Sequence, residues 1–255
     1  MSKVPFRWLG NKVSLLHHFG SLPNTIERII EPYAGSMAYS FNNAKRNTKV
    51  VGYELDDRVV GIYDWLSKTT TKEIDSLRVM YEGLSQDGAL LSDVDVCQEI
   101  KHWLSLGGAM LPVFRNKIYP RMKHPNWESV KKCLPLIQSN NFKIVHGSSH
   151  KIIESTTGDM LFVDPPYWES GHLYDADSYH PSQTIELINK ANIPTILTYG
   201  DFAPDHFREY NFNVLERITL NKPRKDSTSR TRTEHASYIN CHSSLFYSNV
   251  FDILK

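Results

Sequence analysis

The sequence predicts a doubly wound α/β sheet into which a mainly helical subdomain is inserted. Short apolar stretches alternate with helical ones along the chain, a pattern typical of parallel sheets. After residue 55 the alternation is interrupted by roughly 80 residues of mainly helical character, whereas a crossover between parallel strands needs only about a dozen residues. We therefore expect residues 1–55 and 141–255 to form the sheet domain and residues 56–140 to form an inserted subdomain.

The expected elements follow one another as strand, helix and strand. A buried strand at 28–30 stops at Glu31-Pro32, because proline lacks the N–H that pairing requires. A helix is expected next at 36–46. Further strands are expected at 48–55, 142–146, 161–164 and 194–199, a helix with proline in its first turn at 181–190, and a closing pair of strands at 213–220 and 237–241. Within the insertion, loops are expected near 85–88 and 111–126.

The composition is that of a soluble globular protein, with 40% hydrophobic and 22% charged residues among 255. No apolar run approaches the length of a membrane span, and the first residues lack the apolar core of a signal peptide. The three cysteines are scattered and odd in number, which fits a reducing compartment and suggests neither a disulfide framework nor a metal site. We expect a cytoplasmic protein without a membrane partner or a bound metal.

Basic residues are concentrated in two segments of a chain whose net charge is only +1. Seven Lys/Arg and one acid lie between residues 101 and 132, and six Lys/Arg and one acid lie between residues 217 and 232. Such segments favour a polyanionic partner, although solvated surface loops can have the same composition.

The octet LFVDPPYW, residues 161–168, combines a buried strand with an acid, two prolines and aromatic rings. Pro165 and Pro166 remove two backbone donors and hold the chain extended after Asp164. The Asp164 carboxylate and the Pro165 carbonyl are thus left as acceptors, close to the ring of Tyr167. Ligands bind at the carboxyl edge of an open α/β sheet, and this arrangement there suits a flat substrate with an NH2 group. The alternative is a proline-rich turn with core aromatics.

A second motif, EPYAGSM at 31–37, joins the first strand to the next helix. Gly35 permits close backbone approach, and the helix start behind it offers unpaired N–H groups. Since a single glycine is weaker than G-x-G-x-x-G, the loop favours a nucleoside over a dinucleotide cofactor. Glu54 ends the next strand about 20 residues later, where an acid can accept hydrogen bonds from ribose hydroxyls. A structural turn and a solvent-facing acid are the alternatives.

These motifs, with FRWLGNK at 6–12 and YEL at 53–55, follow the order of a known family. The chain resembles the Dam-type (alpha-arrangement, D12-class) adenine-specific DNA methyltransferases over nearly its whole length, least over residues 56–140. It departs from the family pattern in Tyr33 for Phe, Glu54 for Asp, and Ser36-Met37 where a second glycine is common. The resemblance implies a Rossmann-like, S-adenosylmethionine-dependent methyltransferase sheet with an inserted target recognition subdomain.

The resemblance also implies roles for individual residues. The residues that would bind S-adenosylmethionine are Trp8, Lys12, Tyr33, Gly35, Glu54, Ser149, His150 and Asp164. The catalytic motif would comprise Asp164, Pro165, Pro166 and Tyr167. Its two acceptors would orient the amine of a flipped-out adenine toward the sulfonium methyl, with Tyr167 stacking on the base.

Double-stranded DNA is the partner that the resemblance implies. In residues 112–123, Arg and Asn can read guanine and adenine edges by paired hydrogen bonds, and a mobile loop at 221–233 is expected to track phosphates. The candidate DNA-binding residues are Arg115, Asn116, Lys117, Arg121, Lys123, Arg224, Arg230 and Arg232. We expect a bacterial or phage-encoded protein that is a monomer in solution and that can bind DNA in more than one copy.

Three other functions remain open. N4-cytosine methylation would use the same acceptor geometry. A catalytically inactive DNA-binding relative would keep the fold, although the intact Asp164 and Tyr167 argue against it. A nicotinamide oxidoreductase is disfavoured by the single-glycine loop.

Overall fold

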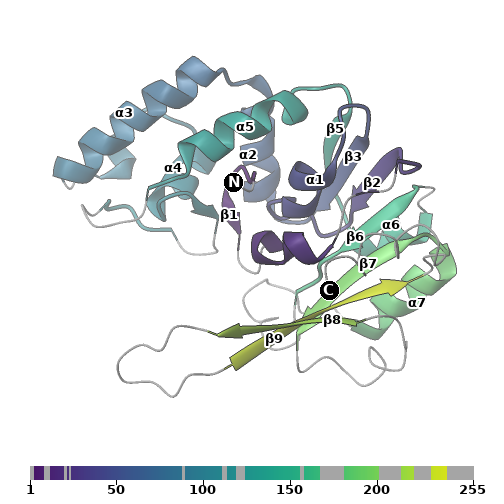
Figure 1. Cartoon of the computed structure of the whole chain (residues 1–255). Coiled ribbons are helices and arrows are strands. Elements are labelled where there is room, and N and C mark those ends of the chain that lie inside the picture. The colour runs from purple at the N-terminus through teal and green to yellow at the C-terminus, as the bar shows by residue number, and fades with distance from the viewer. Residues whose placement is uncertain are drawn as a thin grey trace.

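The computed structural model contains a seven-stranded sheet in the order β5-β3-β2-β6-β7-β9-β8 (Figure 1). It describes residues 3–8, 12–19, 22, 24–87, 90–110, 114–118, 124–155, 158–166, 181–200, 214–220 and 231–239. Among the described strands of this sheet, only β9 runs in the direction opposite to the others. From β2 the chain proceeds to β3 and β5 on one side and to β6 and β7 on the other. The expected doubly wound, Rossmann-like α/β sheet is confirmed.

The elements have the following bounds. The strands of the sheet are β2 (Arg28–Glu31), β3 (Lys49–Glu54), β5 (Phe142–His146), β6 (Met160–Val163), β7 (Thr195–Gly200), β8 (Val214–Leu220) and β9 (Thr231–Ile239). A separate parallel pair is formed by β1 (Arg7–Trp8) and β4 (Ala109–Met110). The helices are η1 (Lys12–His18), α1 (Ala38–Asn43), α2 (Asp57–Lys68), α3 (Thr71–Asp87), η2 (Leu91–Asp93), α4 (Gln98–Ser105), α5 (Trp127–Ile137), α6 (Ser149–Ser155) and α7 (Pro181–Ala191). No helix in the described ranges is long and apolar enough to cross a membrane.

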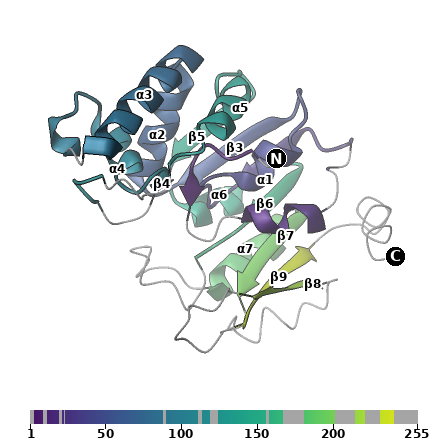
Figure 2. The same ribbon diagram turned by 60° about the vertical axis from the view of Figure 1, so that its left-hand side comes forward.

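Helices cover both faces of the sheet, and alternate strand residues supply each face. The face that η1 and α1 cover, here called the η1 face, is formed by Ile29, Val50, Phe162 and Ile196. The opposite face, covered by α6 and α7, is formed by Ile30, Leu161, Val163 and Leu197. Figures 1 and 2 show the two helical layers on either side of the sheet. Because β6 lies between both layers, all four of its residues are buried.

The segment between β3 and β5 packs against the sheet through a continuous hydrophobic core. Ile62 of α2 and Val130 of α5 belong to the same buried cluster as Val50 of β3. The Asp56 side chain caps α2 by accepting from the Arg58 N–H, and the Asn126 side chain caps α5 in the same way. The division of the chain at residues 56–140 stays a prediction.

Two expected helix boundaries are wrong. Helix α1 is shorter than the expected 36–46, because Met37 has a left-handed φ of 48° and Ala44 is extended. Helix α3 continues to Asp87, where a loop was expected. Helix α6 was not anticipated and begins at Ser149.

The closing strand pair is longer than expected. Strand β9 begins at Thr231, and its first residues pair with the end of β8, as in Leu220↔Thr231. Residues 231–233, expected in a mobile loop, are therefore strand, because long-range pairing satisfies their backbone groups. Residues 221–230 lie outside the described ranges.

Candidate functional site

Polar side chains gather at the carboxyl edge of the sheet, where four parallel strands end beside one another. These side chains are Glu31 of β2, Glu54 of β3, Asp164 directly after β6, and Thr198 of β7. Each lies an even number of residues beyond a core residue of the η1 face, so all four belong to that face. The edge lies where the strand order changes direction, which is the usual ligand site of an open α/β sheet.

Asp164 is held through one of its carboxylate oxygens. Lys12 Nζ lies 2.7 Å from Asp164 Oδ1, and the Thr198 hydroxyl donates to the same oxygen at 2.6 Å. The Lys12 side chain is 2% exposed and that of Asp164 is 19% exposed. The Asp164 carboxyl group therefore lies at the edge of the interior, paired with a buried lysine. Tyr167, predicted to complete the motif, lies outside the described residues.

Trp8, predicted to contact the cofactor, lies against the glycine loop. Gly35 has a φ of 45°, and a Cβ atom there would approach Trp8 Cδ1 to 2.6 Å. Trp8 reaches this position because β1 pairs with β4 and the Arg7 guanidinium donates to the carbonyls of Leu106 and Gly107. Glycine is thus required both by the backbone conformation and by the indole.

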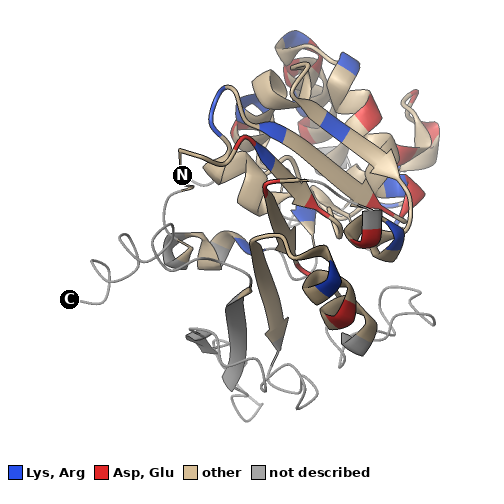
Figure 3. Cartoon of the chain, turned by 90° about the vertical axis from the view of Figure 1, so that its right-hand side faces the viewer, with Lys and Arg blue, Asp and Glu red and all other residues tan. Residues whose placement is uncertain are grey.

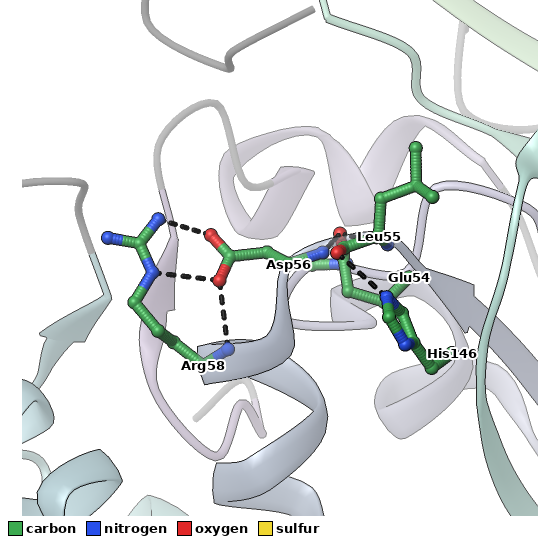
Figure 4. A network of polar contacts seen from close by, with 6 residues as sticks. Glu54, Leu55, Asp56, Arg58 and His146 are labelled. Carbon is green, nitrogen blue, oxygen red and sulfur yellow. Dashed lines mark hydrogen bonds and ion pairs between the residues drawn. The ribbon is translucent and has the colours of Figure 1, made fainter.

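Glu54 organises the backbone around the same loop. Its Oε2 accepts from the Gly35 N–H at 2.8 Å, and its Oε1 accepts from the N–H groups of Leu55 and Asp56 at 2.9 and 3.0 Å. Burial raises the pKa of Glu54, while these hydrogen bonds oppose the rise. Figure 4 shows Leu55 projecting away from the polar network, and its side chain is 62% exposed. The His146 ring nitrogen lies 3.1 Å from the Leu55 carbonyl.

Glu31 is a second carboxyl group near Asp164. It is 2% exposed, and its Oε1 accepts from the Ser40 N–H at 2.8 Å. Burial raises the pKa of Glu31 to about 8, and the negative charge of Asp164 contributes to the rise. With a pKa of about 8, the Glu31 carboxyl is predominantly protonated at neutral pH.

Three of the predicted cofactor residues lie on the opposite side of the sheet. The Tyr33 hydroxyl and the His150 Nε2 approach Thr184 Oγ1 of α7 at 3.1 and 3.3 Å, and the Ser149 hydroxyl donates to the carbonyl of Pro32. Burial raises the pKa of Tyr33 and lowers that of His150. These side chains join α6 and α7 to the segment that follows β2. The other predicted cofactor residues gather toward the η1 face, namely Trp8, Lys12, Gly35, Glu54 and Asp164.

The candidate DNA contacts are only partly described. Arg115 is exposed. The Asn116 side chain is engaged at both ends, since its Oδ1 accepts from the Ser92 N–H at 2.8 Å and its Nδ2 donates to the Ser92 hydroxyl at 3.2 Å. Lys117 forms a β-bridge with Leu90, and Arg232 lies in β9.

Four further DNA candidates, Arg121, Lys123, Arg224 and Arg230, lie outside the described residues. Basic and acidic residues alternate over the described elements in the view of Figure 3. Phe114, 40% exposed, lies beside His102 with ring centroids 6.0 Å apart.

Three features of the site were not predicted from the sequence: the hydrogen bond from Thr198 to Asp164, the bonds of Arg7 that hold the arm in place, and the burial of Glu31. A signal was present for Glu31, because an acid that ends a strand before a glycine loop is placed at the carboxyl edge. Nothing near Thr198 in PTILTY marks it as a partner of Asp164, 34 residues away. Arg7 could not be distinguished from any basic residue of an N-terminal arm.

No family model matches the chain. Among solved structures, it is similar to the C-terminal domain of precorrin-6Y C5,15-methyltransferase from Rhodobacter capsulatus, with 11% identity, coverage of 94% of this chain and 100% of that one, and a TM-score of 0.43. It is also similar to a putative methyltransferase from Streptococcus mutans solved with SAH (8% identity, 89% and 96% coverage, TM-score 0.37) and to an rRNA methylase from Streptococcus thermophilus (8%, 89% and 94%, 0.35). At TM-scores this low the likeness says nothing about substrate. The strand order itself establishes the Rossmann-like sheet.

Proposed function

We propose that this protein transfers the methyl group of S-adenosylmethionine to the N6 amine of an adenine flipped out of double-stranded DNA. The observation that carries this proposal is the placement of Asp164. Its carboxylate follows β6 directly, is followed by two prolines, and lies at the same sheet edge as the loop formed by Gly35 and Glu54. An acceptor pair for an amine and a nucleoside site would thus share one edge.

The residues present fit S-adenosylmethionine. Gly35 lets the Trp8 indole lie against the loop, where a Cβ atom would collide with it, and this indole would cover the bound cofactor. Glu54 Oε2 accepts a hydrogen bond from the Gly35 N–H, and a carboxylate oxygen can accept a second one from a ribose hydroxyl. The exposed side chain of Leu55 offers apolar surface beside it for an adenine ring. When bound, S-adenosylmethionine supplies an electrophilic methyl group on a sulfonium.

The side chains and backbone of the edge would then prepare the substrate amine. That amine is a poor nucleophile, because its lone pair is delocalised into the ring. The Asp164 carboxylate and the Pro165 carbonyl would each accept a hydrogen bond from one N–H of the amine, which favours a pyramidal nitrogen with its lone pair directed at the methyl group. Preorganised hydrogen-bond acceptors stabilise the transition state because the site does not have to reorganise during the reaction. The amine would displace the sulfur of the cofactor directly, a neutral thioether would leave, and the methylated amine would then release one proton to solvent, so no covalent enzyme intermediate and no cysteine are needed.

DNA is proposed as the substrate because the sequence resembles DNA methyltransferases and because its two basic segments suit a polyanionic partner. The inserted segment supports such a partner through Arg115, which is exposed, and Lys117 beside it. Neutralised phosphates would supply most of the affinity, and base contacts would supply the preference for one sequence.

The test is product analysis with a randomised duplex pool and isotopically labelled cofactor. We expect the wild-type protein to form N6-methyladenine. Asp164→Ala should abolish transfer while cofactor affinity, measured by calorimetry, stays within about threefold, which is well under 1 kcal/mol. Glu54→Ala should instead weaken cofactor binding by about 1–3 kcal/mol, the usual value for hydrogen bonds to a charged group. Asp64→Ala, an exposed substitution on α2, is the matched control.

Each other outcome assigns a different function. N4-methylcytosine would establish the cytosine alternative. Cofactor binding without a methylated base in any DNA would refute the DNA substrate. Absence of cofactor binding together with DNA binding would identify an inactive relative. Substantial turnover by Asp164→Ala would show that the carboxylate is not the acceptor.

A further inference from the structure

The register between β6 and β7 brings a threonine level with Asp164. The last paired residues are Val163↔Leu197, so Asp164 and Thr198 are the next residues of two neighbouring parallel strands. Both belong to the η1 face. The Thr198 side chain is fully buried, and a β-branched residue in a strand has few accessible χ1 rotamers. Its hydroxyl is therefore fixed where it donates to Asp164 Oδ1 at 2.6 Å.

Lys12 reaches the same oxygen from the other direction. It is the first residue of η1, which lies on this face of the sheet, and its Nζ is 2.7 Å from Asp164 Oδ1. An ammonium group that is 2% exposed requires an anionic partner, because burial of an unpaired charge is strongly unfavourable. Lys12 and Asp164 thus hold each other in place.

Both donors converge on Oδ1, and within the described part of the chain no side chain donates a hydrogen bond to Oδ2. Two fixed donors on one oxygen define the plane of the carboxylate, since rotation about its terminal bond would break both contacts. A carboxylate can accept about four hydrogen bonds in all, roughly two on each oxygen, so toward the described residues Oδ2 keeps its capacity to accept. The described surroundings of Asp164 are therefore asymmetric, with one oxygen anchored and the other available.

We propose that Thr198 and Lys12 are positioning residues, which anchor Asp164 Oδ1 so that Oδ2 is the atom that accepts the substrate amine. This inference rests on the proposed function and assigns Lys12 to the carboxylate, where the sequence resemblance had implied a contact with the cofactor. A misplacement of about 1 Å at a reacting group can lower a rate by about a hundredfold. Loss of one anchor should therefore reduce the rate of transfer far more than cofactor affinity.

If the role of Thr198 were purely structural, its loss would affect stability and not the rate of transfer. A second buried threonine in β7 provides the matched control. Thr195 of β7 is also fully buried, and its hydroxyl donates to the Ile193 carbonyl at 2.8 Å, on the other end of the strand from Asp164. Thr195→Val and Thr198→Val both replace a buried hydroxyl by a methyl group. Only the second removes a donor to Asp164.

The experiment compares Thr198→Val, Thr198→Ser and Thr195→Val by kcat, by cofactor Kd and by thermal unfolding. Thr198→Val should lower kcat by about 10- to 100-fold, with cofactor Kd changed less than about threefold. Thr198→Ser should retain kcat within about threefold, because it keeps the donor, and Thr195→Val should leave kcat unchanged. Equal kcat for the two valine variants, or a serine variant as slow as Thr198→Val, would overturn the proposal.

Lys12→Met keeps the inference testable if Thr198→Val does not fold. It removes the second donor while preserving an unbranched buried chain, and it should show the same split between kcat and Kd. Weaker cofactor binding with an unchanged kcat would overturn the role of Lys12 and return it to the cofactor.

If the proposed function is wrong, the wild-type protein itself methylates no DNA, and this result separates that failure from a failure of the anchoring. In that case crystal structures decide the anchoring: the Asp164 carboxylate should rotate in Thr198→Val and not in Thr198→Ser. An unrotated carboxylate in both variants refutes it.

Discussion

Gly35→Ala tests the packing of the N-terminal arm on the glycine loop. Alanine at a φ of 45° is destabilised by about 1–2 kcal/mol, because its Cβ approaches a backbone carbonyl. The new Cβ would also lie 2.6 Å from Trp8 Cδ1 and 2.8 Å from Trp8 Nε1, so the indole must move. Overpacking of this kind destabilises by about 1–3 kcal/mol. The two effects together should lower the free energy of unfolding by about 2–5 kcal/mol.

A double-mutant cycle with Trp8→Ala separates the two effects. In the Trp8→Ala background only the backbone effect remains, so Gly35→Ala should lower the free energy of unfolding by about 1–2 kcal/mol. Urea unfolding followed by far-ultraviolet circular dichroism measures each variant. Gly83→Ala, in the middle of α3 with no atom within 4 Å of the added Cβ, is the control and should stabilise by about 0.5–1 kcal/mol.

The cycle can refute either part of the reasoning. Equal effects of Gly35→Ala in both backgrounds, within about 0.5 kcal/mol, would show that the indole does not lie against the loop. An effect near zero in both would show that Gly35 is not in the left-handed region.

Three further predictions concern charge, stability and recognition. Glu31 has a pKa of about 8 when folded and an ordinary value of 4.5, so it binds a proton in the folded state that the unfolded state has lost. The stability it contributes is therefore complete below pH 4.5 and is lost as the pH rises through 8, by at most about 1.4 kcal/mol per pH unit. Glu31→Gln should flatten the dependence of the free energy of unfolding on pH, measured by urea titrations between pH 5 and 8, about the range set by those two pKa values. The exposed control Glu73→Gln should leave that dependence unchanged. A slope that persists after Glu31→Gln would contradict the raised pKa of Glu31. Asn116→Ala should destabilise the fold by about 1–2 kcal/mol through its lost bonds to Ser92. Arg115→Ala should change the free energy of unfolding by less than about 0.5 kcal/mol. It should weaken binding to the target DNA by about 1–3 kcal/mol and relax the sequence preference at one base position. Methylation of a randomised pool and thermal unfolding distinguish the pair, and an unchanged sequence preference for Arg115→Ala would remove its role in recognition.

The sequence alone determined most of the sheet and the chemical character of its edge. Strand β5 matches its expected bounds, and β2, β3, β6 and β7 lie within a residue or two of theirs. These predictions succeed because they depend on local patterns, namely apolar runs that end at an acid or a proline. The same holds for Gly35 and Asp164, whose positions at strand ends follow from the residues next to them.

Only the tertiary structure decided which polar groups face one another. Tyr33 and Gly35 are two residues apart, yet the Tyr33 hydroxyl bonds to α7 while Gly35 lies under Trp8. Asn116, predicted to read a base, is engaged by Ser92, 24 residues earlier. These partners depend on how distant segments pack, and neighbouring residues in the sequence carry no record of that packing.

The contacts of Asp164 show the same division most clearly. The sequence determined that an acid would end this strand, because the apolar run and the two prolines are local. Its ion pair with Lys12 and its hydrogen bond from Thr198 required the strand order, the β6–β7 register and the seating of η1 on one face. The hydrogen-bond partner of a polar group is whichever complementary group the fold brings within about 3 Å, and that proximity is a property of the whole packed chain.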